Sequence, residues 1–215
     1  MKTTEIVMIL DASGSMYDLT EDTIGGFNSF IEDQKANNEA GDQVLVSAVK
    51  FSDSSKVMYD RVPIEKIEKM SKRQYRTGGC TALLDAMGDA IKHIGNVHKY
   101  ARKEDVPAST IFVIITDGYE NASHKYSSDE IKALVKKQEK KYGWEFLFLG
   151  ANIDAVETGA DFGFRQENSI NYLADEVGTK KIYKAVSCAV MNARTCGSIQ
   201  ADWAEEVSED YENRK

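Results

Sequence analysis

The sequence predicts a three-layer α/β fold, in which helices cover both faces of a mostly parallel β-sheet. Short apolar runs alternate with segments of helical periodicity along the 215 residues, which is the pattern of successive β-α units. The runs are apolar on both faces, as expected for parallel strands buried between two layers of helices. A chain of this length can bury a sizeable core as one large domain.

Six apolar runs are predicted to form the strands. Only residues 52–56 separate the second run from the third, which is too short for a crossover helix. We therefore expect these two strands to form an antiparallel hairpin, with one of them at an edge of an otherwise parallel sheet. The predicted strands are residues 6–10, 44–51, 57–62, 110–116, 146–149 and 169–173.

Four segments have the periodicity of amphipathic helices. The third opens with the capping box Ser127-x-x-Glu130 and is predicted to end at Gly143, while the fourth is stopped by Gly197. The apolar positions that mark the four helices span residues 19–31, 83–97, 131–138 and 182–193.

The last segment, residues 198–215, is acidic and only weakly periodic. It could be a short terminal helix or a frayed end, and the helix is favoured because Trp203 needs cover. We therefore expect a domain over residues 1–197, followed by this appendage.

Composition and charge argue against several classes of partner. A formal net charge of −8 disfavours the phosphate backbone of nucleic acids. Apolar runs such as Ile111 to Ile115 are too short to span a bilayer, and no signal-peptide core follows Met1. Three cysteines include no CxxC pair, and Cys188 and Cys196 lie about 12 Å apart along a predicted helix, too far to pair. We expect a cytoplasmic protein with neither a nucleic acid nor a membrane as its partner.

Polar side chains cluster where predicted strands end. Asp11, Ser13 and Ser15 follow the first strand, Asp117 follows the fourth, and Thr81 comes just before the second long helix. In an open α/β sheet, ligands bind beyond the carboxyl ends of the strands, where the strand order reverses. We therefore expect the two aspartates to face each other there, with the three hydroxyls around the same hollow.

The expected donors are all oxygen atoms, from two carboxylates and three hydroxyls. Such a set selects hard cations, meaning Mg²⁺, Mn²⁺ or Ca²⁺, and the lack of His or Cys argues against zinc. An ion held mainly by neutral hydroxyls, with one open position, attracts a carboxylate from outside. The site is therefore suited to bind an acidic residue of a partner rather than to catalyse a reaction.

These motifs together resemble the metal-ion-dependent adhesion site of von Willebrand factor type A domains. All five positions carry the expected residue type, and the resemblance covers residues 3 to 195. It implies a six-stranded sheet of order 3-2-1-4-5-6 and a role in protein binding. It also implies that Ser13, Ser15 and Thr81 ligate the metal directly, and that Asp11 and Asp117 do so directly or through water. The short chain resembles stand-alone bacterial or phage members of the family.

Two other functions stay open beside a metal-dependent binding module that is not an enzyme. A metal-dependent hydrolase of phosphates or esters would need a base near the ion, but Ser13 and Ser15 lack a partner histidine. A regulatory partner of a bacterial ATPase would use the same binding chemistry on a different protein. Candidate partner contacts at the rim of the site are Glu120, Asn121 and His124.

Each motif also has a plainer interpretation. Thr81 could cap the helix that follows it, and it could do so while ligating a metal. Cys80 is expected to be structural, because no base is evident nearby. The run from Lys136 to Lys141 could be a basic docking patch, although lysines at a helix C-terminus are ordinarily solvated.

Overall fold

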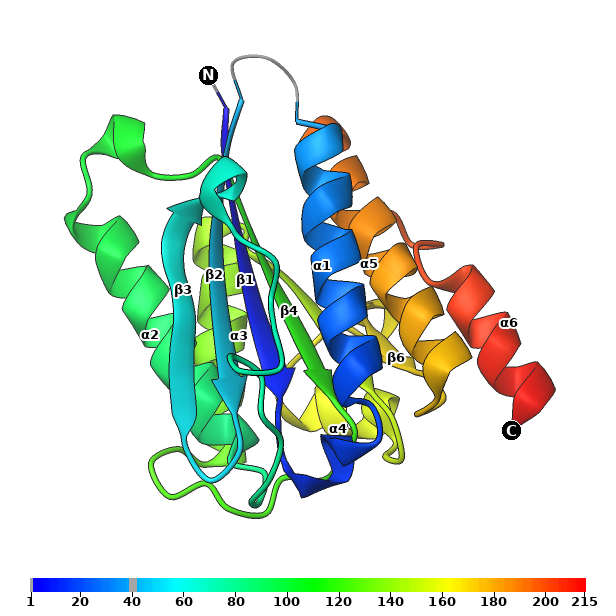
Figure 1. The fold of residues 1–215 in the computed structure, drawn as a ribbon. Coiled ribbons are helices and arrows are strands. Elements are labelled where there is room, and N and C mark those ends of the chain that lie inside the picture. Colours follow the sequence, from blue (N-terminus) through cyan, green and yellow to red (C-terminus); the bar gives the residue numbers. More distant parts are fainter. Residues whose placement is uncertain (1, 39–41) are drawn as a thin grey trace.

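The computed structural model describes residues 2–38 and 42–215, and its centre is a six-stranded sheet of order β3-β2-β1-β4-β5-β6 (Figure 1). Every neighbouring pair is parallel except β2 and β3, which form an antiparallel hairpin at one edge. The predicted fold class, strand order and antiparallel pair are therefore confirmed. The strands are β1 (Thr3–Asp11), β2 (Gln43–Phe51), β3 (Ser55–Pro63), β4 (Ser109–Thr116), β5 (Glu145–Gly150) and β6 (Ser169–Asn171).

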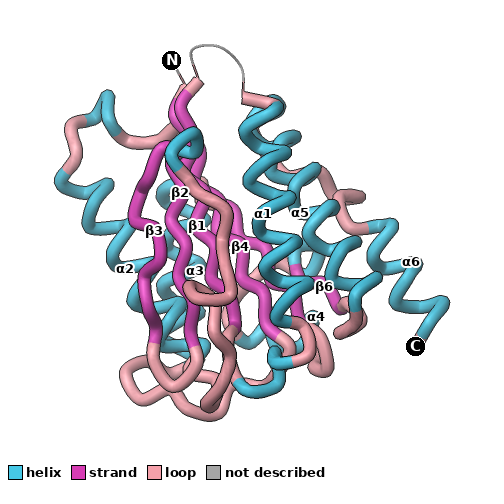
Figure 2. Tube along the Cα trace, in the orientation of Figure 1, coloured by secondary structure: helices cyan, strands magenta, loops and turns pink. Residues whose placement is uncertain are grey.

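Helices lie on both faces of the sheet (Figures 1 and 2). One helix was not predicted: residues 155–161 form α4, whose first amides are capped by the Asp154 carboxylate. The sequence predicts no element over this segment, because seven residues are too few to show a helical period. The helices are α1 (Thr20–Ala36), α2 (Leu83–Tyr100), α3 (Ser128–Tyr142), α4 (Ala155–Asp161), α5 (Glu176–Cys196) and α6 (Glu205–Arg214).

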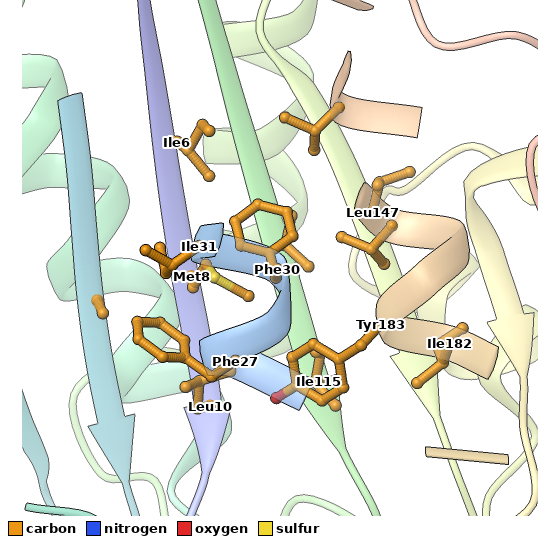
Figure 3. Packing of buried hydrophobic residues seen from close by; sticks show 14 of the residues in the cluster. Ile6, Met8, Leu10, Phe27, Phe30, Ile31, Ile115, Leu147, Ile182 and Tyr183 are labelled. Carbon is orange, nitrogen blue, oxygen red and sulfur yellow. The ribbon is translucent and has the colours of Figure 1, made fainter. Parts of the chain in front are cut away.

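Alternate side chains of β1 enter two separate cores. Ile6, Met8 and Leu10 pack beneath α1 and α5, as Figure 3 shows, whereas Val7 and Ile9 pack beneath α2 and α3. All five side chains are completely buried. A strand covered on both faces must be apolar along its whole length, which explains its uninterrupted hydrophobic run.

Local signals at the helix ends match the structure. The Ser127 hydroxyl and the Glu130 carboxylate form a complete capping box at the start of α3. Gly143 and Gly197 follow α3 and α5 with φ angles of +66° and +88°, which glycine adopts without steric cost.

The edge strand β3 is irregular. Its pairing with β2 shifts register on both sides of Ala48, and Arg61 has a φ of +51°. The Arg61 side chain points inward, where its Nε lies 2.7 Å from Oε1 of the buried Glu5. Ser47 Oγ accepts a hydrogen bond from the Arg61 backbone amide and so fixes the irregular segment.

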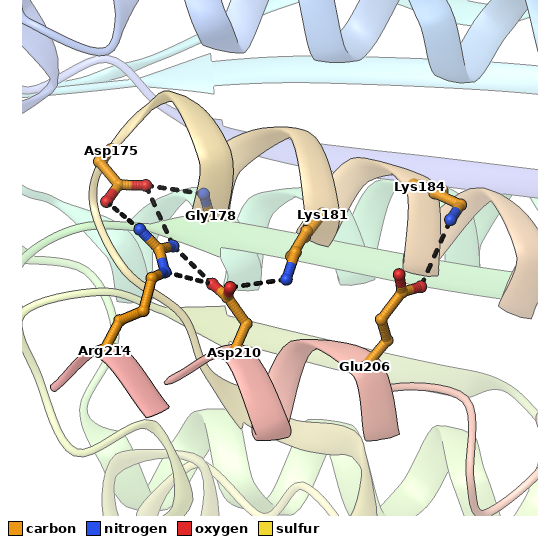
Figure 4. Close-up of polar contacts among 7 residues, drawn as sticks. All are labelled: Asp175, Gly178, Lys181, Lys184, Glu206, Asp210 and Arg214. Carbon is orange, nitrogen blue, oxygen red and sulfur yellow. Dashed lines mark hydrogen bonds and ion pairs between the residues drawn. The ribbon is translucent and has the colours of Figure 1, made fainter. Parts of the chain in front are cut away.

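The tail forms helix α6, which packs against α5 (Figure 4). Val207 is buried beneath it, and Arg214 pairs with both Asp175 and Asp210. Asp210 also accepts from Lys181 Nζ at 2.6 Å. The helix predicted for the tail is therefore present.

The structure also describes the state of the cysteines and the character of the helices. Cys80, Cys188 and Cys196 are all free thiols, so the prediction that Cys188 and Cys196 do not pair is confirmed. None of the helices in the described part of the chain combines the length and hydrophobicity needed to cross a bilayer.

Candidate functional site

The candidate site lies where β1 and β4 end, side by side at the centre of the sheet. The chain leaves β1 toward β2 on one side and reaches β4 on the other, so the strand order reverses between them. Asp11 is the last residue of β1, and Asp117 directly follows β4. The two aspartates thus emerge at the switch point, where open α/β sheets bind ligands.

Two loops bring hydroxyl groups toward Asp117, which lies on a third loop. Ser15 Oγ donates to Asp117 Oδ1 at 2.6 Å and lies 3.1 Å from Ser13 Oγ. The Thr81 loop meets them at Gly118, because a Cβ atom built on Gly118 would lie 3.7 Å from Ser15 Oγ and 4.0 Å from Thr81 Oγ1. The structure therefore brings together the side-chain oxygens of Ser13, Ser15, Thr81 and Asp117.

Asp11 lies behind these oxygens and shapes the first loop. Its carboxylate is buried, with Oδ1 accepting from the Ser13 amide at 2.7 Å and Oδ2 accepting from Thr116 Oγ1 at 2.6 Å. The Tyr75 hydroxyl donates to the backbone carbonyl of Asp11. Burial raises the pKa of Asp11, and the hydrogen bonds from Thr116 and Ser13 oppose that shift.

Asp117 has fewer hydrogen-bond partners. Burial raises the pKa of Asp117, the hydrogen bond from Ser15 lowers it, and the nearby charge of Asp11 raises it further. Two carboxylates held close together in a poorly solvated place favour a cation between or beside them.

Backbone contacts hold the Thr81 loop against its neighbours. Gly14 N donates to the Gly79 carbonyl at 3.0 Å, and Gly78 N donates to the Ala12 carbonyl at 2.8 Å. Gly79 has a φ of +85°, and a Cβ there would lie 2.0 Å from Oδ2 of Asp53. The backbone angle favours glycine here, and the Asp53 side chain lies against it.

Asp53 is a positioning residue that the sequence did not mark. It lies in the turn between β2 and β3, and its Oδ1 accepts from the Cys80 amide at 3.0 Å. Two residues after Cys80, the Ala82 amide donates to the Ser52 carbonyl at 2.8 Å. No local motif distinguishes this aspartate from an ordinary turn residue, because its role depends on a contact 27 residues away.

Of the three predicted rim residues, Glu120 and Asn121 have side chains tied to the protein itself. Glu120 accepts from the amides of Ala122, Ser123 and Leu84, the last at the start of α2. Asn121 Oδ1 accepts from the Thr81 amide at 2.9 Å. These two residues therefore fix the loops around the candidate site.

His124, the third rim residue, is exposed. Its backbone amide donates to Asp85 Oδ2 at 3.0 Å, which ties the rim loop to the first turn of α2. This anchoring leaves the imidazole ring at the surface of the loop.

The suggestion that Thr81 caps α2 is wrong. The N-cap position is Ala82, and no side chain at that position makes a capping bond. The first free amides of the helix donate instead to Glu120 and to Ser123 Oγ, which reach them from another loop. The Thr81 hydroxyl is thereby left available for a ligand.

Two exposed tyrosines flank the site and were not predicted. Tyr17 and Tyr119 are 74% and 62% exposed, and they follow the loops that carry Ser15 and Asp117. Aromatic side chains are enriched in protein interfaces, where each buries a large area at little cost in conformational entropy. Their position close behind Ser15 and Asp117 was visible in the sequence, but their exposure was not.

The donor set fits a hard divalent cation. Octahedral Mg²⁺ with oxygens at its usual bond length has adjacent ligands roughly 2.9 Å apart. The Ser13–Ser15 and Ser15–Asp117 oxygen pairs are separated by 3.1 and 2.6 Å, close to that spacing. Among the described residues, no group of three or more His, Cys, Asp or Glu side chains is arranged to hold a metal. A metal site here therefore depends on hydroxyls combined with carboxylates.

The two aspartates are expected to contribute differently to stability without metal. Asp11→Ala leaves the buried Ser13 amide and Thr116 hydroxyl without their acceptor, so we expect a loss of about 2 kcal/mol in the free energy of unfolding. Asp117→Ala removes a buried charge that is repelled by Asp11, and should leave the stability unchanged or slightly higher. Urea denaturation of both variants in chelator measures this difference. Equal losses would show that Asp117 has an additional structural role.

The chain matches a known protein family. The family described as von Willebrand factor type A domain matches residues 5–187. None of the curated proteins matches the chain.

Several solved structures share the fold. Proximal thread matrix protein 1 from the mussel byssus has a TM-score of 0.59 and 16% identity, covering 88% of this chain and 46% of its own. The PilB minor pilin from Streptococcus sanguinis gives 0.63 and 12%, with coverages of 88% and 61%. A von Willebrand factor type A protein from Catenulispora acidiphila gives 0.57 and 12%, with coverages of 89% and 43%. The chain thus spans between 43% and 61% of the length of these proteins, and at such identities the likeness shows the fold alone.

Proposed function

Because the chain belongs to the von Willebrand factor type A domain family, we propose that it binds a partner protein through a divalent cation at the ends of β1 and β4. Domains of this family are commonly metal-dependent protein-interaction modules. The observation that carries the proposal is the convergence of three hydroxyl oxygens and the Asp117 carboxylate from three separate loops.

Ser13, Ser15, Thr81 and Asp117 would hold the cation, with Asp11 acting directly or through water. Oxygen donors favour Mg²⁺, with Mn²⁺ and Ca²⁺ as alternatives. One structure of the mussel protein has zinc at its metal-ion-dependent adhesion site. In this chain the proposed ligands include no soft donor, so Mg²⁺ is expected to bind in preference to zinc. When bound, the cation supplies an electrophilic position that accepts an oxygen ligand from outside.

The proposed ligand from the partner is a Glu or Asp carboxylate. The bound cation offsets the negative charge of the protein locally, so an acidic residue can approach despite the net charge of −8. Tyr17 and Tyr119 would pack against the partner on either side of that residue, and Asn121 and His124 would tune the affinity. Glu120 would act indirectly, by holding the rim loop in place.

Binding is favoured over hydrolysis by the location of the histidines. His93 pairs with Asp60, and His98 pairs with Glu5, both in the second half of α2, whereas the proposed metal lies near its first residue. His124 is exposed on the rim loop, and among the described residues no hydrogen bond joins a histidine to Ser13, Ser15 or Asp117. A hydrolase would need a base beside the metal-bound water. The observed network around Ser15 instead positions ligands for a cation.

The same proposal assigns binding to residues 1–197 and treats the segment 198–215, with α6, as an appendage packed on α5. We place the protein in a reducing compartment, the cytoplasm, because its cysteines are exposed and unpaired. The negative net charge argues against nucleic acid as the partner.

Affinity capture with and without metal tests the proposal. We expect the wild-type protein in Mg²⁺ to retain a partner that is released in chelator, and Thr81→Ala to retain little of it under either condition. Changing the critical Glu or Asp of that partner to its amide should abolish retention, because a neutral oxygen is a weaker ligand for a hard ion. A partner retained equally in all four conditions would dock elsewhere and contradict the proposal.

A further inference from the structure

A pocket lies at the opposite end of the sheet from the candidate metal site. It is formed by the last turns of α2 and α3 and by the loop that leads into β4. Its lining includes Gly95, His98, Val106, Pro107, Tyr142 and Trp144. We call it the Trp144 pocket.

The pocket has the size and walls of a site for one aromatic ring. Its volume is about 150 Å³, and an apolar cavity of roughly this volume accommodates benzene. The Trp144 ring is stacked 5.2 Å from Phe112 and meets His98 edge-on at 5.3 Å. Because His98 is itself bound to Glu5 at 2.6 Å, this wall is held rigid before any ligand arrives.

A buried polar group in the lining has no partner. Gln138 is 6% exposed, and its Oε1 forms no hydrogen bond with any described residue. Gly95, in the interior of α2, lets this side chain pack directly against the helix, since a Cβ there would lie 3.3 Å from Gln138 Nε2. A phenol hydroxyl both donates and accepts, so it can satisfy either end of this amide.

The surroundings of the pocket are basic, in contrast to the protein as a whole. Lys99 lines it, and Lys141 precedes Tyr142 with its Nζ 5.1 Å from the centre of that ring. Neither lysine forms an ion pair within the described part of the chain, whereas Glu104 and Asp105 of the adjoining loop both pair with Arg102. Unpaired cations beside an apolar pocket attract an acidic segment.

We propose that the Trp144 pocket docks a tyrosine side chain from an acidic segment of a partner protein. The ring fills the apolar space beside Trp144, its hydroxyl reaches the Gln138 amide, and flanking carboxylates approach Lys99 and Lys141. This contact requires no metal and lies apart from the candidate metal site.

A short peptide can test the docking in the intact protein in chelator. The probe is the capped pentapeptide Asp-Glu-Tyr-Glu-Asp, and the readout is the indole N–H signal of each tryptophan in an NMR titration. The chain has two tryptophans, so Trp203, which lies on the tail, serves as an internal control. We expect a saturable shift of the Trp144 signal alone. An unmoved Trp144 signal would overturn the proposal.

Matched peptides and variants separate the contributions. Replacing the peptide tyrosine by alanine, or its acids by lysine, should weaken binding at least about tenfold. Lys141→Glu should weaken it similarly, whereas Lys66→Glu, an exposed lysine elsewhere, should not. Tyrosine should bind more tightly than phenylalanine in the wild type, and this preference should vanish in Gln138→Leu. Equal binding of the alanine peptide, or of free phenol, would overturn docking by an acidic tyrosine segment.

Discussion

Replacing Glu5 with alanine is expected to lower the free energy of unfolding by about 3–5 kcal/mol. Glu5 is completely buried on β1, and each of its two carboxylate oxygens pairs with a different side chain. Oε1 lies 2.7 Å from Arg61 Nε, and Oε2 lies 2.6 Å from His98 Nε2. The alanine variant leaves both partners without an acceptor, and the His98 side chain is only 8% exposed, so water cannot replace the carboxylate there.

Urea denaturation of wild type and variant measures this effect. Glu32→Ala is a suitable control, because Glu32 forms its ion pair with Lys69 at the surface and should contribute nothing measurable. If both variants lost the same small amount, the buried network would not stabilise the fold as argued. Glu5 precedes the run predicted as the first strand, so its burial was not expected from the sequence.

Replacing Asp117 with alanine is expected to lower Mg²⁺ affinity by more than about 100-fold, because loss of an outer partner of a ligand alone costs 10–100-fold. Both oxygens of Asp11 are already engaged by the Ser13 amide and the Thr116 hydroxyl. Asp117 accepts from Ser15 through Oδ1 and is therefore the carboxylate best placed to neutralise the ion.

Calorimetric titration of the metal-free protein with Mg²⁺ measures the affinity. Asp18→Ala is the matched control, because it removes the same charge from an exposed residue three positions after Ser15. It should change the affinity only slightly. If Asp117→Ala bound Mg²⁺ as tightly as the Asp18→Ala control, the proposed ligand set would be wrong.

The fold was predictable because its signals are local. The five-residue connection between the second and third predicted strands is enough to require a hairpin, and the Ser127 capping box marks the start of α3. Helix α4 lacked such a signal, since one capping aspartate followed by seven residues resembles a turn.

The candidate site was predictable in its residues but not in its supports. The aspartate and hydroxyl motifs follow strand ends, and parallel strand ends meet at one edge of a sheet. By contrast, Glu120 caps a helix 36 residues earlier in the chain, and Asn121 holds Thr81 across 40 residues. Such contacts depend on how separate loops pack, and a glutamate that caps a distant helix has the same sequence context as one that meets a partner.

The inward-pointing Arg61 also bears on how copies of this chain behave toward each other. An edge strand with regular free amides and carbonyls is a template on which a strand of a second molecule can add, which begins aggregation. On β3, the shifted register and the left-handed backbone at Arg61 break that template in the middle, and the charge is turned toward Glu5. The residue that anchors the buried carboxylate thus also keeps the open edge of the sheet from joining another sheet.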